Sequence, residues 1–430
     1  MRIALVHPWF LAMGGAEATV DALAVAFPEA DIRCLLFQPE QLPAHLRGKD
    51  VRGSGINWLP GKFHWYRQLL PYWPSAVEMV DLRGYDLVVT SDSSIMKGVD
   101  TDQDAVHICY CHTPMRCLWD LHLEFYKNMP GLLRPVFRYG THYVRGWDFQ
   151  AAQRVDHFVA NSRYVQRRIQ KYYRRESPVI YPPVDTGKGY VSKNHDDYYL
   201  WVGRLTATKR VDLLVSACTR LGRRLVVAGA GREYKRLKAM AGPTVEFLGR
   251  VPGDQLPDLY ANCRALLFAA DEDFGIVPVE AQSYGRPVIA YGHGGSLETV
   301  RVNDLAGRPD TGRFFAEQTV ESVMDGINRF ERDEYRFEPI AIRRHSLQFD
   351  TAIFIKKIRR FADAAMNRDR LHEPVKQVYR SRFNAVSAAV TPLGNAALNT
   401  STKTNGAREI VALPGVRRNF RSSIAMHMSG

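Results

Sequence analysis

The sequence lacks any long apolar run, and this absence excludes a bundle of membrane-spanning helices. Among the 430 residues, no stretch approaches the roughly 20 consecutive apolar residues that cross a bilayer as a helix. Cysteine is scarce as well: six irregularly spaced cysteines exclude a disulfide scaffold and indicate reduced thiols. The opening MRIALVHPWF is too short for a secretory signal. We therefore expect a cytoplasmic protein, either soluble or bound to a membrane surface.

Acidic residues are outnumbered by basic ones. The chain has 45 Asp and Glu against 58 Lys and Arg, a formal charge of +13. This excess predicts an anionic partner, such as phosphates, acidic lipid headgroups or nucleic acid. The apolar share of 46% and charged share of 24% are ordinary for a globular protein, which excludes disorder over most of the chain. At this length, two to three domains are expected.

Short, continuous apolar runs recur along the chain, each followed by a turn and a helix-like segment. Such runs are typical of parallel strands that helices cover on both faces. We predict strands at 2–6, 32–37, 86–90, 106–111, 157–160, 199–202, 225–228, 245–248, 265–269 and 287–290. Ser162 is expected to cap a helix start, and Gly222, Gly242 and Gly285 are expected to end helices in the left-handed conformation.

The pattern predicts an α/β protein with two similar halves. The paired prolines of YPPVDTGKGYVSKNHDD, 181–197, cannot lie in a central strand and mark the joint. We expect an N-terminal Rossmann-like domain at 1–184, a linker at 185–197 and a second Rossmann-like domain at 198–345. A C-terminal helix at 346–366 and a basic, disordered tail at 367–430 would follow.

Two segments of the second half carry residue types suited to a nucleotide ligand. DEDFGIVPVEAQSYGRPVIA, 271–290, places Glu272 on a loop and Glu280 eight residues later, near a helix start. A carboxylate there can accept both hydroxyls of a diol such as ribose, although helix capping is the alternative. WVGRLTATKRVDLLVSA, 201–217, adds Arg204 and Lys209 between a strand and a helix, where cations and free amides can hold a diphosphate.

Two segments of the first half also carry the resemblance described next: MGGAEATVDALA, 13–24, and HICYCHTPMRCLWD, 107–120. Over residues 1–365 the chain resembles the retaining glycosyltransferases of family 4, which have the GT-B fold: two Rossmann-like domains that face each other across a cleft. The resemblance implies that His112 and Glu272 are catalytic. It implies the donor-binding residues Gly14, Gly15, Arg204, Lys209, Phe274, Gly275, Ile276 and Glu280.

The phrase H-T-P-M-R-x-x-W-D resembles one subgroup, the bacterial mannosyltransferases that build O-antigen and exopolysaccharide. This resemblance adds Arg116, Trp119 and Asp120 as possible donor or acceptor contacts. It implies retaining transfer of a hexose, mannose from GDP-mannose, onto a lipid-linked saccharide. Because two cations and helix-start amides can neutralise the departing diphosphate, we expect neither a metal nor a cofactor.

The acceptor is expected to meet the first domain at the cytoplasmic face of the inner membrane. Aromatic and basic residues gather at 56–74 and basic ones at 134–175, a combination that suits an anionic bilayer surface. Alternatives are a UDP-sugar-dependent transferase of the same family, or an epimerase or phosphorylase-like enzyme of the same fold. A nucleic-acid binder is suggested only by charge, since no RNA or DNA module appears; we expect no nucleic-acid partner.

Overall fold

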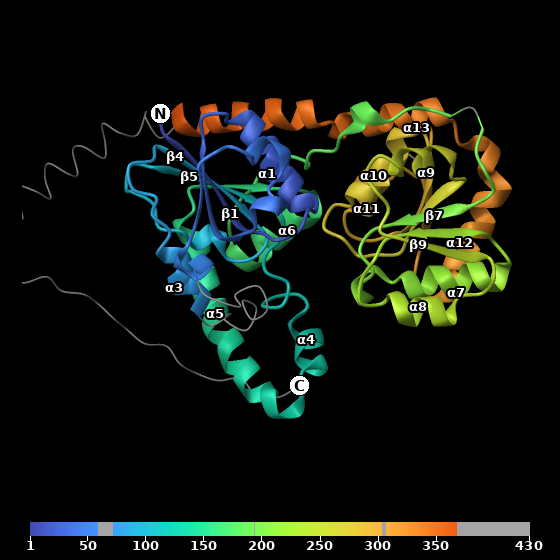
Figure 1. Cartoon of the computed structure of the whole chain (residues 1–430), viewed down its shortest axis with the longest axis horizontal. Coiled ribbons are helices and arrows are strands. Elements are labelled where there is room, and N and C mark those ends of the chain that lie inside the picture. Colours follow the sequence, from blue (N-terminus) through green and yellow to red (C-terminus); the bar gives the residue numbers. More distant parts are fainter. Residues whose placement is uncertain (59–71, 193, 303–306, 368–430) are drawn as a thin grey trace, which may run out of the picture. The chain divides into compact units, whose positions relative to one another are not determined.

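The computed structural model describes residues 1–58, 72–192, 194–302 and 307–367. The described residues belong to one compact unit, which contains two α/β domains (Figure 1). Most of the aromatic and basic stretch at 56–74 and almost all of the predicted tail at 367–430 lie outside the described residues.

The first domain is built on a parallel sheet of six strands in the order β3-β2-β1-β4-β5-β6. Its strands are β1 (Ile3–Phe10), β2 (Asp31–Phe37), β3 (Val51–Gly53), β4 (Leu87–Asp92), β5 (Val106–Cys111) and β6 (His157–Ala160). Five of these were predicted. The edge strand β3 was not, because three partly exposed residues with an arginine among them do not form an apolar run.

The second domain repeats this plan, with six parallel strands in the order β12-β11-β10-β7-β8-β9. They are β7 (Tyr199–Val202), β8 (Leu225–Ala228), β9 (Val245–Gly249), β10 (Ala265–Phe268), β11 (Val288–Tyr291) and β12 (Gly312–Phe315). Only the edge strand β12 was not predicted. The expectation of two Rossmann-like domains with parallel sheets is confirmed.

Both faces of each sheet are covered by apolar side chains, which explains the continuous apolar runs. In β1, Ile3 and Leu5 belong to one core cluster, while the intervening Ala4 and Val6 belong to the cluster on the opposite face. Successive side chains of a strand point to opposite faces, so a strand between two helical layers needs apolar residues at every position.

The helices that supply these layers alternate with the strands (Figure 1). They are α1 (Gly15–Ala26), α3 (Trp73–Glu78), α4 (His122–Asn128), α5 (Arg134–Arg154), α6 (Arg163–Tyr173), α7 (Val211–Leu221), α8 (Tyr234–Met240), α9 (Leu256–Asn262), α10 (Ile276–Ser283), α11 (Ser296–Thr299), α12 (Val320–Asp333) and α13 (Pro339–Ser346). Ser162 caps α6 by accepting from the third amide of the helix at 3.1 Å, as predicted.

Helix ends at Gly222 and Gly285 are left-handed as predicted, with φ of 66° and 74°. The prediction for Gly242 was wrong, because its φ is not positive. This glycine instead lies close to α7, where an added Cβ would come within 2.5 Å of the Thr219 side chain.

Residues 351–367 form a helix that packs against the first sheet. Phe354, Ile358 and Ala362, spaced by four, belong to the same core cluster as Ile3 and Leu5. The chain thus returns to its first domain, and the two crossing segments pair where Val184 bridges to Asp350.

Candidate functional site

The paired glutamates lie on the loop and the helix that follow β10. Glu272 is in the loop, and Glu280 is in α10. Between them, Gly275 begins α10 with a φ of 90°, a left-handed backbone that costs glycine little. Because glycine has no side chain with which to cap the helix, the first amides of α10 remain open to an anion.

The two cations predicted to bind a diphosphate follow β7, which pairs with β10 in the sheet. Lys209 ends the short helix η8 (Ala207–Lys209) and forms an ion pair with Glu272. Arg204 is exposed and makes no hydrogen bond or ion pair with the described residues. The carboxyl ends of β7 and β10 thus carry one paired and one unpaired cation beside the loop of Glu272.

Glu280 is held by a pair of stacked tyrosines. The Tyr260 hydroxyl donates to Oε2 of Glu280 at 2.7 Å, and the Tyr260 ring stacks on Tyr284 with centroids 5.5 Å apart. Burial raises the pKa of Glu280, and the hydrogen bond from Tyr260 partly opposes this effect. The other oxygen, Oε1, has no hydrogen-bond partner among the described residues.

His112 directly follows β5 and is held in a chain of polar groups. Its Nε2 lies 2.8 Å from Oγ of Ser91, which lies 3.2 Å from Nδ1 of His7. The Nε2 of His7 lies 3.7 Å from Glu17 in the first turn of α1. Burial and the nearby His7 lower the pKa of His112 to about 4. His112 is therefore neutral near pH 7.

The starts of two helices meet at this site. Gly14 is the N-cap of α1 and Gly15 is its first residue, while Ile276 is the first residue of α10. A Cβ on Gly15 would lie 2.6 Å from Cδ1 of Ile276, so the two helix starts are in close contact. Two helix N-termini, each with partial positive charge, are thereby adjacent, one from each domain.

Arginines from the first domain hold the loop of Glu272. Arg116 donates to the backbone oxygen of Asp271 at 3.3 Å and to Asp120 at 3.1 Å. Arg168 in α6 donates to Asp120 at 2.7 Å and forms an ion pair with Asp273. The predicted contacts Arg116 and Asp120 are thus brought to the site, where they link the two domains.

Two other predicted residues support the site from behind. The Trp119 indole donates to the buried Asp148 at 2.8 Å, and its ring stacks on Tyr172. Phe274 is 4% exposed and packs edge-on against Phe349 in the segment that crosses between the domains. Both aromatic rings thus pack against neighbouring side chains, and their contact with a donor or acceptor stays a prediction.

Sequence reasoning missed several residues that the structure brings to the site. Arg168 lies 105 positions before its partner Asp273, so no local pattern could reveal the pair. Glu298 in α11 accepts from the first two amides of α6 at 2.9 and 3.0 Å, which is a helix cap supplied by the other domain. Asp271 and Asp273 had a visible signal, the Asp-x-Asp spacing around Glu272.

Within the described ranges, no three His, Cys, Asp or Glu side chains are grouped so that they could hold a metal ion. The carboxylates of an Asp-x-Asp pair can bind a divalent metal, which in turn binds phosphates. Here, however, Asp271 accepts from His293 at 3.0 Å and Asp273 pairs with Arg168. Metal independence stays a prediction.

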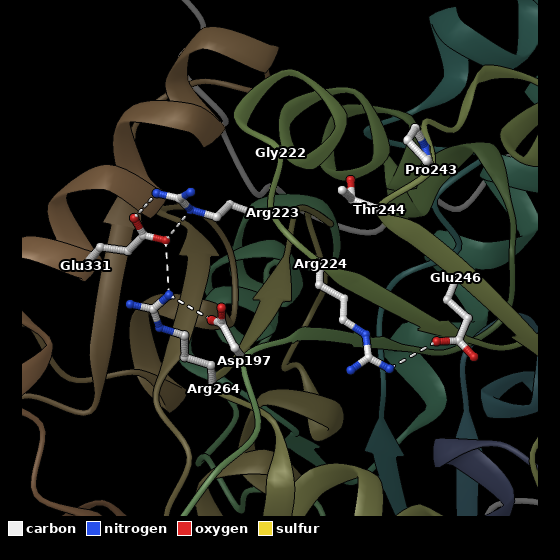
Figure 2. A pocket seen from close by; sticks show the side chains of 9 residues that line it. All are labelled: Asp197, Gly222, Arg223, Arg224, Pro243, Thr244, Glu246, Arg264 and Glu331. Carbon is white, nitrogen blue, oxygen red and sulfur yellow. Dashed lines mark hydrogen bonds and ion pairs between the residues drawn. The ribbon is translucent and has the colours of Figure 1, made fainter.

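A hollow of about 720 Å³ lies at the opposite, amino ends of the second sheet (Figure 2). Its charged side chains are already paired. Arg223 binds Glu331 through two hydrogen bonds of 2.7 and 2.8 Å, and Arg264 reaches both Glu331 and Asp197. Ligands of open α/β sheets bind outside the carboxyl ends of the strands, so we place the candidate site there and not in this hollow.

Comparisons with known proteins agree with this architecture. Residues 13–188 match the family described as Glycosyltransferase Family 4, and residues 188–346 match Glycosyl transferases group 1. The structure is similar to that of Anabaena HepE in complex with UDP, with a TM-score of 0.62 at 18% identity, covering 85% of this chain and 100% of that one.

Two relatives illustrate the sequence similarity. The α-1,3/1,6-mannosyltransferase ALG2 of Candida glabrata is 22% identical over an alignment of 366 positions that covers 70% of this chain and 78% of ALG2. The GDP-mannose-dependent α-(1-6)-phosphatidylinositol monomannoside mannosyltransferase of Mycobacterium tuberculosis is 34% identical over an alignment of 144 positions that covers 29% of this chain and 36% of that protein. The chain is a glycosyltransferase of the GT-B fold, with a family 4 domain followed by a group 1 domain.

Proposed function

We propose that the protein transfers mannose from GDP-mannose to a lipid-linked saccharide, with retention at the anomeric carbon, in the synthesis of a bacterial surface polysaccharide or exopolysaccharide. The observation that carries the proposal is the cluster of Glu272, Glu280, Lys209 and Arg204 beside two adjacent helix starts. The names of the mannosyltransferase relatives favour mannose, and that of the mycobacterial relative favours GDP-mannose.

Each group has a role that its surroundings suit. Glu280 would accept the ribose hydroxyls through its open Oε1. The exposed Arg204, together with Lys209 and the amides of α1 and α10, would bind the diphosphate and stabilise the charge that develops on it as it leaves. Because Lys209 already neutralises Glu272, donor binding would exchange this ion pair for contacts to phosphate and to sugar hydroxyls.

In the proposed reaction the bond between the anomeric carbon and the diphosphate oxygen breaks. The acceptor hydroxyl attacks the anomeric carbon from the face of the sugar ring that the diphosphate leaves. Its proton passes to the departing phosphate, so no side chain has to act as a base. His112 would orient the sugar. Since its pKa is lowered to about 4, the imidazole is neutral and does not repel the positive charge that develops on the sugar ring.

One observation favours a second donor. The similar HepE structure contains UDP, so a UDP-sugar-dependent transferase is the alternative that deserves a direct test. Thermal stabilisation of the purified protein by GDP, UDP, GDP-mannose and UDP-glucose separates the two. A ligand at a hundredfold its Kd adds about 2.7 kcal/mol of stability.

We expect stabilisation by the two guanine nucleotides, without added metal and in the presence of a chelator. Stabilisation by the uracil nucleotides alone would transfer the proposal to a UDP-sugar. Stabilisation that requires a divalent metal would overturn metal independence. No stabilisation by any of the four would contradict the nucleotide-sugar site itself.

A further inference from the structure

Helices α4 and α5 form a pair that extends away from the first sheet (Figure 1). Its outer side carries four large apolar side chains. Leu132 is 89% exposed, Val136 68%, Tyr139 76% and Tyr143 62%. Val136, Tyr139 and Tyr143, spaced by three and four residues, lie on one side of α5, and Leu132 precedes them in the short helix η6 (Gly131–Leu133). We call these four side chains the apolar stripe.

This stripe is separate from the side of α5 that packs on the domain. The buried residues of α5 include Thr141, Val144 and Asp148, which lie at other positions of the helical turn. A surface helix needs one apolar side for its own packing. The second apolar side of α5 therefore has no partner within the described residues, and exposed apolar patches of this kind mark interaction surfaces.

The exposed stripe lies on an ordered scaffold. His122 of α4 stacks on Phe137 of α5 with ring centroids 5.5 Å apart. The Arg134 guanidinium donates to the backbone oxygens of Met129 and Lys127 at 3.2 and 3.1 Å, which closes the turn between the helices. The geometry of the pair is thus set by its own contacts, and α4 adds the exposed Leu123 at 68%.

The charge around the stripe identifies the kind of partner. Residues 121–146 contain four cations (Lys127, Arg134, Arg138 and Arg145) and a single acid, Glu124. Arg134 and Arg145 donate to nearby backbone oxygens, whereas Lys127 and Arg138 are exposed. Exposed apolar and tyrosine side chains on a segment of net positive charge suit the interface of an anionic bilayer, where tyrosine lies at the level of the headgroups. Among the helices that the structure describes, none combines the length and the hydropathy of a membrane-spanning segment.

We propose that the apolar stripe of the α4–α5 pair, Leu132, Val136, Tyr139 and Tyr143, docks the enzyme on a bilayer that contains anionic lipids, with the exposed cations Lys127 and Arg138 of the same pair adding electrostatic attraction. The inference deepens the proposed function and rests on it insofar as the acceptor is lipid-linked. Helix α4 begins two residues after Asp120, so docking would bring the loop of Arg116 and Asp120 close to the surface that holds the acceptor.

The test is flotation of the full chain with vesicles of phosphatidylcholine alone and of phosphatidylcholine mixed with phosphatidylglycerol. The double variant Leu132→Glu/Val136→Glu places two charges on the stripe, and we expect its partition coefficient for the mixed vesicles to fall at least about tenfold. Arg138→Glu should lower it by about fivefold per unit of charge, and more at low salt.

A matched control is Tyr335→Glu/Ile340→Glu, since these side chains are 85% and 58% exposed on the second domain. We expect it to bind vesicles like the natural protein. Nucleotide-induced stabilisation, measured on every variant, reports the donor site separately from the membrane contact. The proposal is overturned if the natural chain floats with neither vesicle, if the stripe variant floats unchanged, or if the stripe variant abolishes self-association of the protein instead.

Discussion

The assignment of Glu280 to the ribose can be tested by combining one substitution with one ligand change. Glu280 has one oxygen bound by Tyr260 at 2.7 Å and one open oxygen. A hydrogen bond to a charged group contributes about 1.5–3 kcal/mol. If a ribose hydroxyl donates to the carboxylate, then its removal from the nucleotide should raise the Kd of the natural protein roughly 10- to 160-fold.

The measurement is calorimetric titration of GDP and 2′-deoxy-GDP, or of the uracil pair, into the natural protein and Glu280→Ala. In the variant, the Kd for GDP should rise by at least the same factor, because the carboxylate is gone. The two nucleotides should then bind the variant equally, since the hydroxyl no longer has its acceptor. Tyr260→Phe should weaken GDP binding only slightly, as it removes a neutral donor and keeps the carboxylate.

Glu246→Ala is the control, because this carboxylate is 52% exposed and lies at the other end of the second sheet. It should leave both Kd values unchanged. A full deoxy penalty that persists in Glu280→Ala would refute the assignment, and so would a natural protein that binds GDP and 2′-deoxy-GDP equally. In either case, helix capping would be the better account of Glu280.

Three further predictions follow from the same contacts. Lys209→Met removes a cation from the proposed diphosphate site and leaves Glu272 unpaired, so kcat/KM should fall about a hundredfold or more. The control is Lys235→Met, which removes an exposed lysine and should leave kcat/KM unchanged. The pKa of Glu280 is raised above the ordinary 4.5, so the carboxylate takes up a proton at a higher pH than an ordinary glutamate does. Nucleotide affinity should therefore weaken as the pH falls through this raised pKa. The same pH dependence in Glu280→Gln would contradict the prediction. Asp148→Ala removes a buried carboxylate that binds Lys97 at 2.6 Å, Trp119 at 2.8 Å and Tyr173 at 2.9 Å. The free energy of unfolding, measured with urea, should fall by about 3–5 kcal/mol, with the exposed Asp100→Ala as the control. A change near zero would show that this buried cluster does not stabilise the fold.

The contacts between the two domains involve residues that no local sequence pattern predicts. Arg168 and Glu298 each reach from one domain to the other, one through an ion pair with Asp273 and one through a helix cap. Burial raises the pKa of Asp273 and the Arg168 charge opposes this effect, so the carboxylate depends on its partner to stay ionised. Arg168 thus holds the loop of Glu272 in place, and Glu298 fixes the start of α6.

Most of the strands could be predicted from the sequence alone, because a parallel strand that is covered on both faces is a continuous apolar run. Apolar runs such as those of β1 and β10 predicted ten of the twelve strands seen in the described residues. Ser162 and Gly222 predicted a helix start and a helix end, since caps depend on the residue at that position. The glutamates and cations of the second domain were visible because loop and helix start are close in sequence.

Only the tertiary structure decided which distant residues meet. It joined His112 to His7 through Ser91, because neighbouring strands of the first sheet end side by side. It placed Trp119 against the buried Asp148, and it showed that α5 has a second apolar side that no described residue covers. Local patterns report the backbone's own preferences, whereas partner choice depends on how the elements pack, and packing is a property of the folded chain.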